Sequence, residues 1–363
     1  MITHHPTPHR GPTVTRLLPR RSIPALALAG AAAMLLAGCA AGEGSSVAPA
    51  ADATADAAGW SADALTLDWA TYNPLSLIVK DQGLVEKRLG SGVTVDWVQS
   101  AGSNKANELL RAGAVDVGST AGSAALLARA NGSPIRTIDV YSQPEWTAIV
   151  VPKGSPITSV DQLRGADIAA TKGTDPYFFL LQTLDQAGIP ASDVTIQNLQ
   201  HADGRAALEN GSVDAWAGLD PLMAASEAEA GSTLLYRNVD FATYGFLNAT
   251  QSFLDASPDL AQAVVDSYEE ARAWAVEHPD ETAAILAQAA AIDPAVASTV
   301  IDRTNLGVDP VPGDAQRAVL ERVGPILVES GDVTDQGKVD TALDELFEPR
   351  FAEAADPASG SAG

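Results

Sequence analysis

The chain has 363 residues, 46% of them hydrophobic, which is enough to bury a large core and to form two lobes of ordinary domain size. It has 22 basic and 46 acidic residues, a formal net charge of −24, so it lacks the basic surface by which proteins bind nucleic acid. Its single cysteine excludes an intrachain disulfide framework and a cysteine-built metal cluster. We therefore expect an acidic globular protein without a cofactor.

Residues 1–38 have the pattern of a lipoprotein signal peptide. Several arginines precede the apolar stretch 23–37, and no acidic residue occurs before Glu43. This stretch is shorter than the roughly 20 residues that span a bilayer. It ends in Leu36-Ala-Gly-Cys39, which is similar to a bacterial lipobox, whose cysteine is acylated. The alternative is an ordinary secretory signal with an incidental cysteine. We expect an exported protein whose Cys39 is lipidated, held on the cell membrane and facing the periplasm or the outside.

Strands and helices alternate along the next part of the chain. Residues 39–61 are rich in Ala, Gly, Ser and Asp, which indicates a flexible tether, and the folded part begins near Leu65. Strands are predicted at 65–69, 93–98, 115–118, 135–140, 147–151, 167–170, 194–199 and 213–216. Helices are predicted at 75–89, 106–113, 124–130, 159–163, 177–188 and 204–210. Repeated strand–loop–helix units indicate an α/β fold with parallel sheets, and the pattern restarts after residue 151.

The remainder of the chain, from Ser257 onward, is predicted to be almost wholly helical. Prolines at 279, 294 and 312 stand at plausible helix starts. We expect these helices to pack on the first lobe. The tail after Phe351 lacks structural signals and is expected to fray.

In the order and spacing of several short segments, the chain resembles the periplasmic binding proteins of ABC importers, within the aliphatic sulfonate, taurine and nitrate group. The segments that carry the resemblance are Tyr72-Asn-Pro-Leu, Glu86-Lys-Arg-Leu, Val95-Asp-Trp-Val, Ala114-Val-Asp-Val-Gly, Ala148-Ile-Val-Val-Pro-Lys, Ser159-Val-Asp-Gln-Leu-Arg-Gly, Lys172-Gly and the run 202–216. Together they extend from about Leu65 to Phe347. No single segment is specific for this family, but the order and spacing of the segments together are.

The resemblance implies a type II periplasmic-binding-protein fold, with two lobes joined by two hinge strands and a ligand cleft between them. Lobe I would comprise residues 62–151 and 241–350, and lobe II residues 152–240. The chain would cross between the lobes near 149–151 and near 244–247. A disordered tail, 351–363, would follow.

Three glycine- and hydroxyl-rich loops before predicted helices are candidates for anion binding. They are Gly102-Ser103-Asn104, Ser119-Thr120-Ala121-Gly122-Ser123 and Gly173-Thr174. Free amides at a helix start stabilise an anion, glycine permits close approach, and Ser or Thr adds hydrogen bonds. The alternative is that these loops are ordinary helix caps and turns.

Other candidates are flat aromatic side chains that would cover an organic group: Tyr72, Trp146, Tyr177 and Trp216. The alternative for these is core packing. Lys172 is a candidate cationic partner, against the alternative of a solvated surface lysine. The candidate ligand-binding residues are Tyr72, Asn73, Gly102, Ser103, Ser119, Thr120, Ala121, Gly122, Trp146, Lys172, Gly173, Thr174, Tyr177, Trp216 and Asp220.

Three carboxylates raise a difficulty, because a negative charge beside a bound anion repels it. Asp175 has an alternative use as a helix cap before Pro176. Glu145 or Asp220 in the cleft would favour a ligand with amine or amide donors.

Catalysis lacks candidate residues. Outside the signal the chain has two histidines, His201 and His278, and no cysteine besides Cys39. Desulfinating enzymes of this fold use a cysteine nucleophile, whereas Cys39 lies in the lipobox. A serine hydrolase that uses His201 stays formally open. We expect a protein that is not an enzyme.

The resulting hypothesis is a monomeric solute-binding lipoprotein of an ABC importer. It would capture an aliphatic sulfonate or similar small organosulfur anion and deliver it to a membrane permease with its ATPase. Nitrate, taurine or a thiamine pyrimidine precursor are alternative ligands. A lipoprotein that acts through protein–protein contacts is the alternative from another class.

Overall fold

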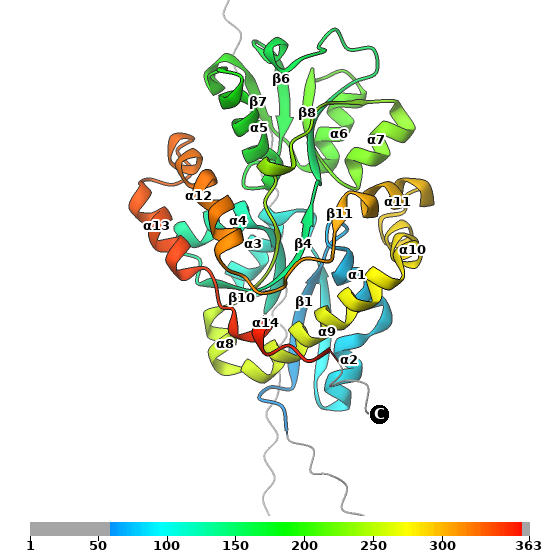
Figure 1. Cartoon of the computed structure of the whole chain (residues 1–363), viewed down its shortest axis with the longest axis vertical. Coiled ribbons are helices and arrows are strands. Elements are labelled where there is room, and N and C mark those ends of the chain that lie inside the picture. The colour runs from blue at the N-terminus through cyan, green and yellow to red at the C-terminus, as the bar shows by residue number, and fades with distance from the viewer. Residues whose placement is uncertain (1–58, 358–363) are drawn as a thin grey trace, which may run out of the picture. The chain divides into compact units, whose positions relative to one another are not determined.

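The computed structural model describes residues 59–357 (Figure 1). The predicted signal peptide and the lipidation residue Cys39 lie outside the described residues. Two mixed sheets organise this part of the chain. The first contains, in order, β11 (Thr304–Asn305), β4 (Ile135–Pro144), β10 (Gly245–Thr250), β3 (Val117–Ala121), β1 (Ala64–Trp69) and β2 (Thr94–Gln99). The second contains β7 (Thr195–Asn198), β6 (Asp167–Ala170), β8 (Ala215–Leu219), β5 (Thr147–Val151) and β9 (Thr233–Tyr236).

Each sheet has a parallel part whose strands lead into helices. In lobe I, β1 pairs in parallel with β2 and β3, and in lobe II, β6 pairs in parallel with β7 and β8. Antiparallel strands β10 and β5 complete the two sheets. The predicted two-lobe α/β architecture is confirmed, but the expectation of parallel sheets is wrong, because antiparallel strands make both sheets mixed. The helices between strands are α1 (Pro74–Gln82), α2 (Leu84–Leu89), α3 (Ser103–Ala112), α4 (Gly122–Ala130), α5 (Asp175–Gln186), α6 (His201–Glu209) and α7 (Leu222–Ala230).

Local sequence explains why one predicted helix is two. Asn73 caps α1 by accepting a hydrogen bond from the Ser76 amide, and Pro74 is its first residue. Gly83 then adopts the left-handed conformation, with φ of 60°, and ends the helix before α2 begins. The expected single helix over 75–89 is therefore broken at a glycine that can adopt this backbone conformation without a steric penalty.

The lobe crossovers lie beside the expected positions. Residues 149–151, expected at a crossing, belong to β5 and pair with β8 and β9 in the second sheet. The first crossing is therefore at Glu145–Trp146, between β4 and β5. The second lies between β9 and β10, and it includes the short helix η4 (Val239–Phe241).

The C-terminal third consists of helices, as predicted, together with the two-residue strand β11. These helices are α8 (Gln251–Ala256), α9 (Pro258–Glu277), α10 (Pro279–Ala290), α11 (Pro294–Asp302), α12 (Asp314–Glu329), α13 (Gln336–Glu345) and α14 (Arg350–Glu353). They cover lobe I, but α11 also contacts α7 and α12 also contacts α5, both in lobe II (Figure 1). The expectation that they pack on the first lobe alone is therefore incomplete.

The two ends of the described part are more ordered than expected. Trp60, expected in the tether, packs on the lobe I core and donates from Nε1 to the Leu89 carbonyl at 3.0 Å. Phe351, expected to begin the tail, is buried in α14. At each end an aromatic side chain packs on an apolar surface. The neighbouring sequence has no periodic apolar pattern, so this packing was not predicted.

Candidate functional site

Helix starts from the two lobes meet between the sheets. The amide Nδ2 of Asn104, in α3, donates to Oε1 of Gln200, which precedes α6, at 3.4 Å. A Cβ atom at Gly173, before α5, would lie 3.8 Å from Asn104 Cβ and from Leu127 Cδ2. We call residues 102–104, 173–175 and 200–201 the interlobe seam. It lies where parallel strands end, the usual position of a ligand in α/β sheets.

The start of α3 lies directly against lobe II. Gly102 precedes the helix with φ of 140° and ψ of 157°, a backbone conformation that is essentially reserved for glycine. A Cβ atom there would lie 2.9 Å from Asn104 Oδ1 and 3.1 Å from His201 Nε2. Ser103 is buried, and its hydroxyl accepts the Ala121 amide at 2.9 Å. Gly102 thus permits the close approach expected of it, and the group that approaches is a histidine.

The expected anion-binding loop at 119–123 is mostly a strand. Ser119, Thr120 and Ala121 belong to β3 and are buried. The amide and hydroxyl of Ser119 donate to Asp68, and Thr120 Oγ1 donates to the Ala121 carbonyl and accepts from Asn248. Small polar residues that resemble a loop in sequence are here paired with buried partners, so the donors expected of this loop already have acceptors.

Groups of the second crossover occupy the start of α4. The Gly122 amide donates to the Tyr244 carbonyl at 2.9 Å, and the Ser123 amide donates to Thr243 Oγ1 at 3.2 Å. A Cβ atom at Gly122 would lie 3.1 Å from the Phe246 ring, so this glycine serves helix packing. The first two amides of α4, of the kind that helices usually leave unpaired, are therefore bonded within the protein.

Asp175 joins α5 to both crossovers. Its Oδ1 accepts from Ser123 Oγ at 2.7 Å and Thr243 Oγ1 at 2.8 Å, and its Oδ2 accepts from Trp146 Nε1 and the Thr243 amide, both at 2.9 Å. Burial raises the pKa of Asp175, and these hydrogen bonds oppose the rise. The expected helix cap is wrong: Thr174 is the N-cap residue, and Asp175 is the first helical residue.

A second buried carboxylate, Asp68, ends β1. It accepts from Ser100 Oγ at 2.5 Å, from the Ser119 amide at 2.9 Å and from Ser119 Oγ at 3.0 Å. Burial raises its pKa to about 6, against the lowering effect of these donors. Tyr72 lies beside this cluster, and its hydroxyl donates to the Ser119 carbonyl at 2.9 Å.

The four aromatic candidates separate into two groups. Tyr72 and Trp146 contact each other edge to face, with ring centroids 6.1 Å apart, next to Asp68 and Asp175. Trp216 is fully buried in the lobe II core against Gly204, and Tyr177 packs in an apolar cluster. The core-packing alternative therefore describes the second pair.

The polar candidates outside the seam have other partners. Asn73 is fully buried, with its amide divided between the Ser76 amide and the Tyr268 hydroxyl. Lys172 is exposed, with Nζ 5.6 Å from the Tyr177 ring centroid. Asp220, two residues before α7, accepts a hydrogen bond from the Ala224 amide at 2.9 Å and forms an ion pair with Arg303 at 3.4 Å.

The remaining carboxylate of concern, Glu145, is also paired. It forms an ion pair with Arg237 across the two crossovers. The negative charges of Glu145 and Asp220 are therefore balanced by arginines.

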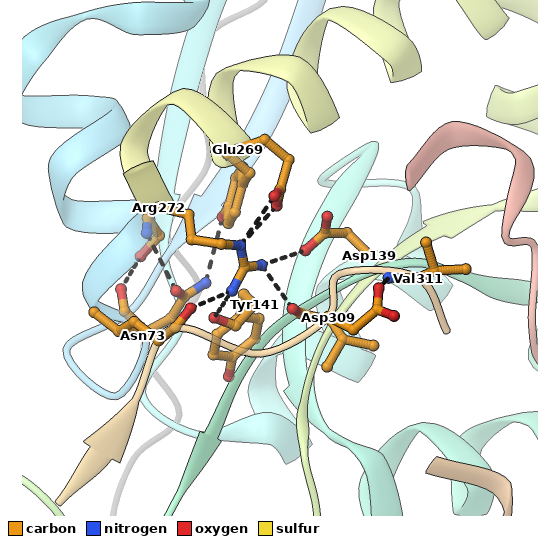
Figure 2. A network of polar contacts seen from close by, with 11 residues as sticks. Asn73, Asp139, Tyr141, Glu269, Arg272, Asp309 and Val311 are labelled. Carbon is orange, nitrogen blue, oxygen red and sulfur yellow. Dashed lines mark hydrogen bonds and ion pairs between the residues drawn. The ribbon is translucent and has the colours of Figure 1, made fainter. Parts of the chain in front are cut away.

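A buried arginine on α9 fixes the strand that leads into the first crossover. Arg272 donates to the carbonyls of Val140 at 2.7 Å, Tyr141 at 3.2 Å and Leu306 at 2.6 Å, and it contacts Glu269 and Asp139 (Figure 2). A guanidinium can satisfy several carbonyls at once because it has five donors. The network ties β4 to the C-terminal helices immediately before the chain crosses to lobe II.

Comparison with known proteins agrees with this architecture. Residues 90–282 match the family described as NMT1/THI5 like. A protein described as aliphatic sulfonates-binding, from Escherichia coli (strain K12), is 30% identical over 249 residues, covering 68% of this chain and 77% of that protein. The chain belongs to the NMT1/THI5-like family. It is an ABC substrate-binding protein of the sulfonate and nitrate type, as the sequence resemblance implied.

Solved structures share the fold of this NMT1/THI5-like protein. The periplasmic aliphatic sulphonate binding protein SsuA from Escherichia coli is 26% identical, with a TM-score of 0.68 over 79% of this chain and 93% of that chain. The alkanesulfonate-binding protein SsuA from Xanthomonas axonopodis pv. citri, bound to MOPS, gives a TM-score of 0.70 at 24% identity, covering 77% and 98%. These named relatives are binding proteins.

Sequence reasoning missed two buried residues of this family member, His201 in the seam and Asp68 in β1. His201 begins α6, whereas the predicted helix began at Gly204, so its place at a helix start was not recognised. Asp68 alternates with apolar residues in β1 and looks solvent-facing, but β1 lies between β2 and β3 and is covered on both faces. A polar residue in a central parallel strand is the signal that could have identified it.

Within residues 59–357, no helix is both long and apolar enough to cross a bilayer. Over the same range, no group of three or more His, Cys, Asp or Glu residues is arranged to hold a metal ion.

Proposed function

We propose that this protein captures an aliphatic sulfonate or a similar small organosulfur anion in the interlobe seam and delivers it to the permease of an ABC importer. The observation that carries the proposal is the meeting of three helix starts, those of α3, α5 and α6, from both lobes. The aliphatic sulfonates-binding relative, 30% identical over 68% of the chain, supports the ligand class.

The chemistry of the ligand fits helix starts better than side-chain cations. A sulfonate stays charged at neutral pH, so a binding site must replace its hydration with donors. First-turn amides supply donors together with the positive end of the helix dipole. Glu145 and Asp220 form ion pairs with arginines, and Asp68 and Asp175 accept hydrogen bonds from several protein donors, which limits their repulsion of an anion.

Capture would couple to lobe closure. The contacts between Asn104 and Gln200, and between Ser123 and Asp175, join the lobes. A solute bound by helix starts of both lobes is held best when these contacts form, so binding favours the closed arrangement. A permease can then distinguish the loaded protein from the empty one.

A thermal-shift and calorimetric screen tests the ligand class. Alkanesulfonates, taurine, nitrate, sulfate and a thiamine pyrimidine precursor are each titrated into the purified protein. A ligand that binds only the folded state raises its melting temperature in proportion to the logarithm of its concentration. We expect stabilisation by alkanesulfonates. Stabilisation by the pyrimidine or nitrate alone would overturn the assignment.

We also propose export and lipid anchoring at Cys39. The support is the arginine-rich start, the apolar stretch 23–37 and Leu36-Ala-Gly-Cys39. Replacing Cys39 with serine should move the protein from the membrane fraction to the soluble exported fraction and abolish incorporation of a labelled fatty acid. Unchanged labelling of Cys39→Ser would contradict the anchor.

A further inference from the structure

The interlobe seam contains two unpaired hydrogen-bond acceptors that both lie close to Gly102. His201 Nε2 and Asn104 Oδ1 lie 3.1 Å and 2.9 Å from the position that a Cβ atom of Gly102 would occupy. His201 is 3% exposed, and both atoms are buried without a hydrogen-bond partner within the described residues. Buried polar atoms are normally bonded, so this pair calls for a partner.

The hydrogen bonds of Thr171 define the protonation of His201. Thr171 Oγ1 lies 2.7 Å from the Leu199 carbonyl, which can only accept, so the single hydroxyl proton is committed there. The contact of 3.2 Å between Thr171 Oγ1 and His201 Nδ1 then requires Nδ1 to donate. In the neutral ring Nε2 therefore has no proton and is an acceptor.

The imidazole is neutral for two reasons. Burial lowers the pKa of His201 to about 4. His201 is also the first residue of α6, where the positive end of the helix dipole disfavours a second positive charge.

Asn104 presents the same kind of atom. Its Nδ2 donates to Gln200 Oε1 at 3.4 Å, which leaves Oδ1 facing the seam. With Gln200 Oε1 as the acceptor, this orientation places Nδ2 against Gln200 and Oδ1 at Gly102. Both atoms are acceptors, and neither can satisfy the other.

We propose that His201 Nε2 and Asn104 Oδ1 accept an N–H or O–H group of the bound solute, so that the preferred ligands are amino- or hydroxy-substituted sulfonates. This inference rests on the proposed function, because it presupposes that the anionic end is held by helix-start amides. The acceptors repel the sulfonate oxygens and direct the donor-bearing end of the solute toward Gly102. His201 and Asn104 thereby determine specificity within the sulfonate class.

Three matched solutes test the preference for donor-bearing sulfonates separately from sulfonate binding itself. Ethanesulfonate, 2-hydroxyethanesulfonate and 2-aminoethanesulfonate are titrated calorimetrically into the wild-type protein. We expect the two donor-bearing solutes to bind about tenfold more tightly than ethanesulfonate, because ethanesulfonate leaves the buried acceptors unpaired; tenfold corresponds to about 1.4 kcal/mol. Equal affinities would overturn the inference and leave sulfonate binding intact. No binding of any of the three would overturn the proposed function itself.

Variants at His201 then test whether the preference for donor-bearing solutes depends on His201 Nε2. His201→Leu should reduce it to less than about threefold, mainly by weakening the donor-bearing solutes, and His201→Gln should restore part of it through a side-chain carbonyl. His278→Leu, which alters the histidine that stacks on Trp274, is the matched control and should retain the full preference. An equal loss for all three solutes in a folded His201→Leu protein would reduce His201 to a structural role and contradict the proposal.

Discussion

The starts of α4 and α6 differ although each follows a parallel strand at the boundary between the lobes. At α4, the amides of Gly122 and Ser123 are bonded to Tyr244 and Thr243, and the Ser123 hydroxyl is bonded to Asp175. At α6, the side chain of the first residue, His201, keeps a buried acceptor that has no partner among residues 59–357. The start of α4 is hydrogen-bonded within the protein, and we call this set of contacts the α4 joint. The start of α6 has a group available for a solute.

This difference shows that residue type at a helix start does not by itself predict a ligand site. The sequence Ser-Thr-Ala-Gly-Ser across the start of α4 contains more donors and glycine than Leu-Gln-His across the start of α6. The crossover brings Thr243 and Tyr244 against α4, and the fold leaves the α6 start facing Gly102. The tertiary partners decide which start can bind a solute.

The largest expected effect comes from removing the joint at α4. Asp175→Ala would leave the hydroxyl of Ser123, the indole N–H of Trp146 and two donors of Thr243 without their acceptor. Because a buried group left unpaired costs about 1–3 kcal/mol, we expect the free energy of unfolding to fall by about 3 kcal/mol or more. Urea denaturation followed by circular dichroism measures the change.

Asp193→Ala is the control for this substitution. Asp193 forms a partly exposed ion pair with Arg164, and such pairs contribute about 0–1 kcal/mol. Similar losses for Asp175→Ala and Asp193→Ala would show that the α4 joint is not a special point of stability.

The next effect is a pH dependence at the buried Asp68. Its pKa rises from 3.8 to about 6 on folding, so the folded state holds the proton more tightly and this contribution to stability falls as pH increases through that window. The fall is about 3 kcal/mol, at roughly 1.4 kcal/mol per pKa unit. His201 has the opposite sign, because its pKa is lowered to about 4 and its contribution grows between that pH and its usual 6.5.

Asp68→Asn removes the first contribution and retains the second. Stability of the variant should therefore rise more steeply with pH between about 4 and 6 than stability of the wild-type protein. Urea denaturation at four pH values from 4 to 7 checks this. A constant difference between the two proteins at every pH would mean that Asp68 does not titrate in this range.

A smaller effect is expected at the start of α3, which lies against lobe II. Gly102→Ala places a Cβ atom 2.9 Å from Asn104 Oδ1 and 3.1 Å from His201 Nε2, in a backbone conformation that costs an L residue about 1–3 kcal/mol. We expect about a tenfold loss of sulfonate affinity with a stability loss of about 1–2 kcal/mol, because closure is impeded.

The matched glycine is Gly113, at the other end of α3. It also has a positive φ, 63°, but a Cβ atom there would meet nothing within 4 Å. Gly113→Ala should lower stability by about 1 kcal/mol and leave affinity unchanged. Calorimetric titration of both variants with one alkanesulfonate shows whether the affinity loss comes from backbone strain or from the interlobe contact at residue 102. Equal affinity losses in the two variants would refute the interlobe explanation.

The fold was largely predictable because its signals are local. Alternation in β1 and β2, and the proline that begins α9, depend on a few consecutive residues, and these elements are confirmed within a residue or two. The site was less predictable because burial depends on distant partners. The sequence predicts Ser119 to be a free donor in a loop, but its amide and hydroxyl donate to Asp68, 51 residues earlier in the chain.

The smallest expected effect is at Lys172, a residue that the sequence suggested as a cationic partner for the ligand. Its side chain is exposed, with Nζ 5.6 Å from the Tyr177 ring centroid, an arrangement worth about 0.5–1 kcal/mol of stability at an exposed site. If helix-start amides hold the anion, Lys172→Ala should change sulfonate affinity by less than about twofold, measured calorimetrically at low and moderate salt. A loss of tenfold or more that disappears as salt increases would instead make Lys172 a direct ionic partner, because exposed charge interactions are screened over about 10 Å at 0.1 M salt. The solute would then be held by a side-chain charge, and the distinction between an occupied α4 start and an available α6 start would no longer explain where it binds.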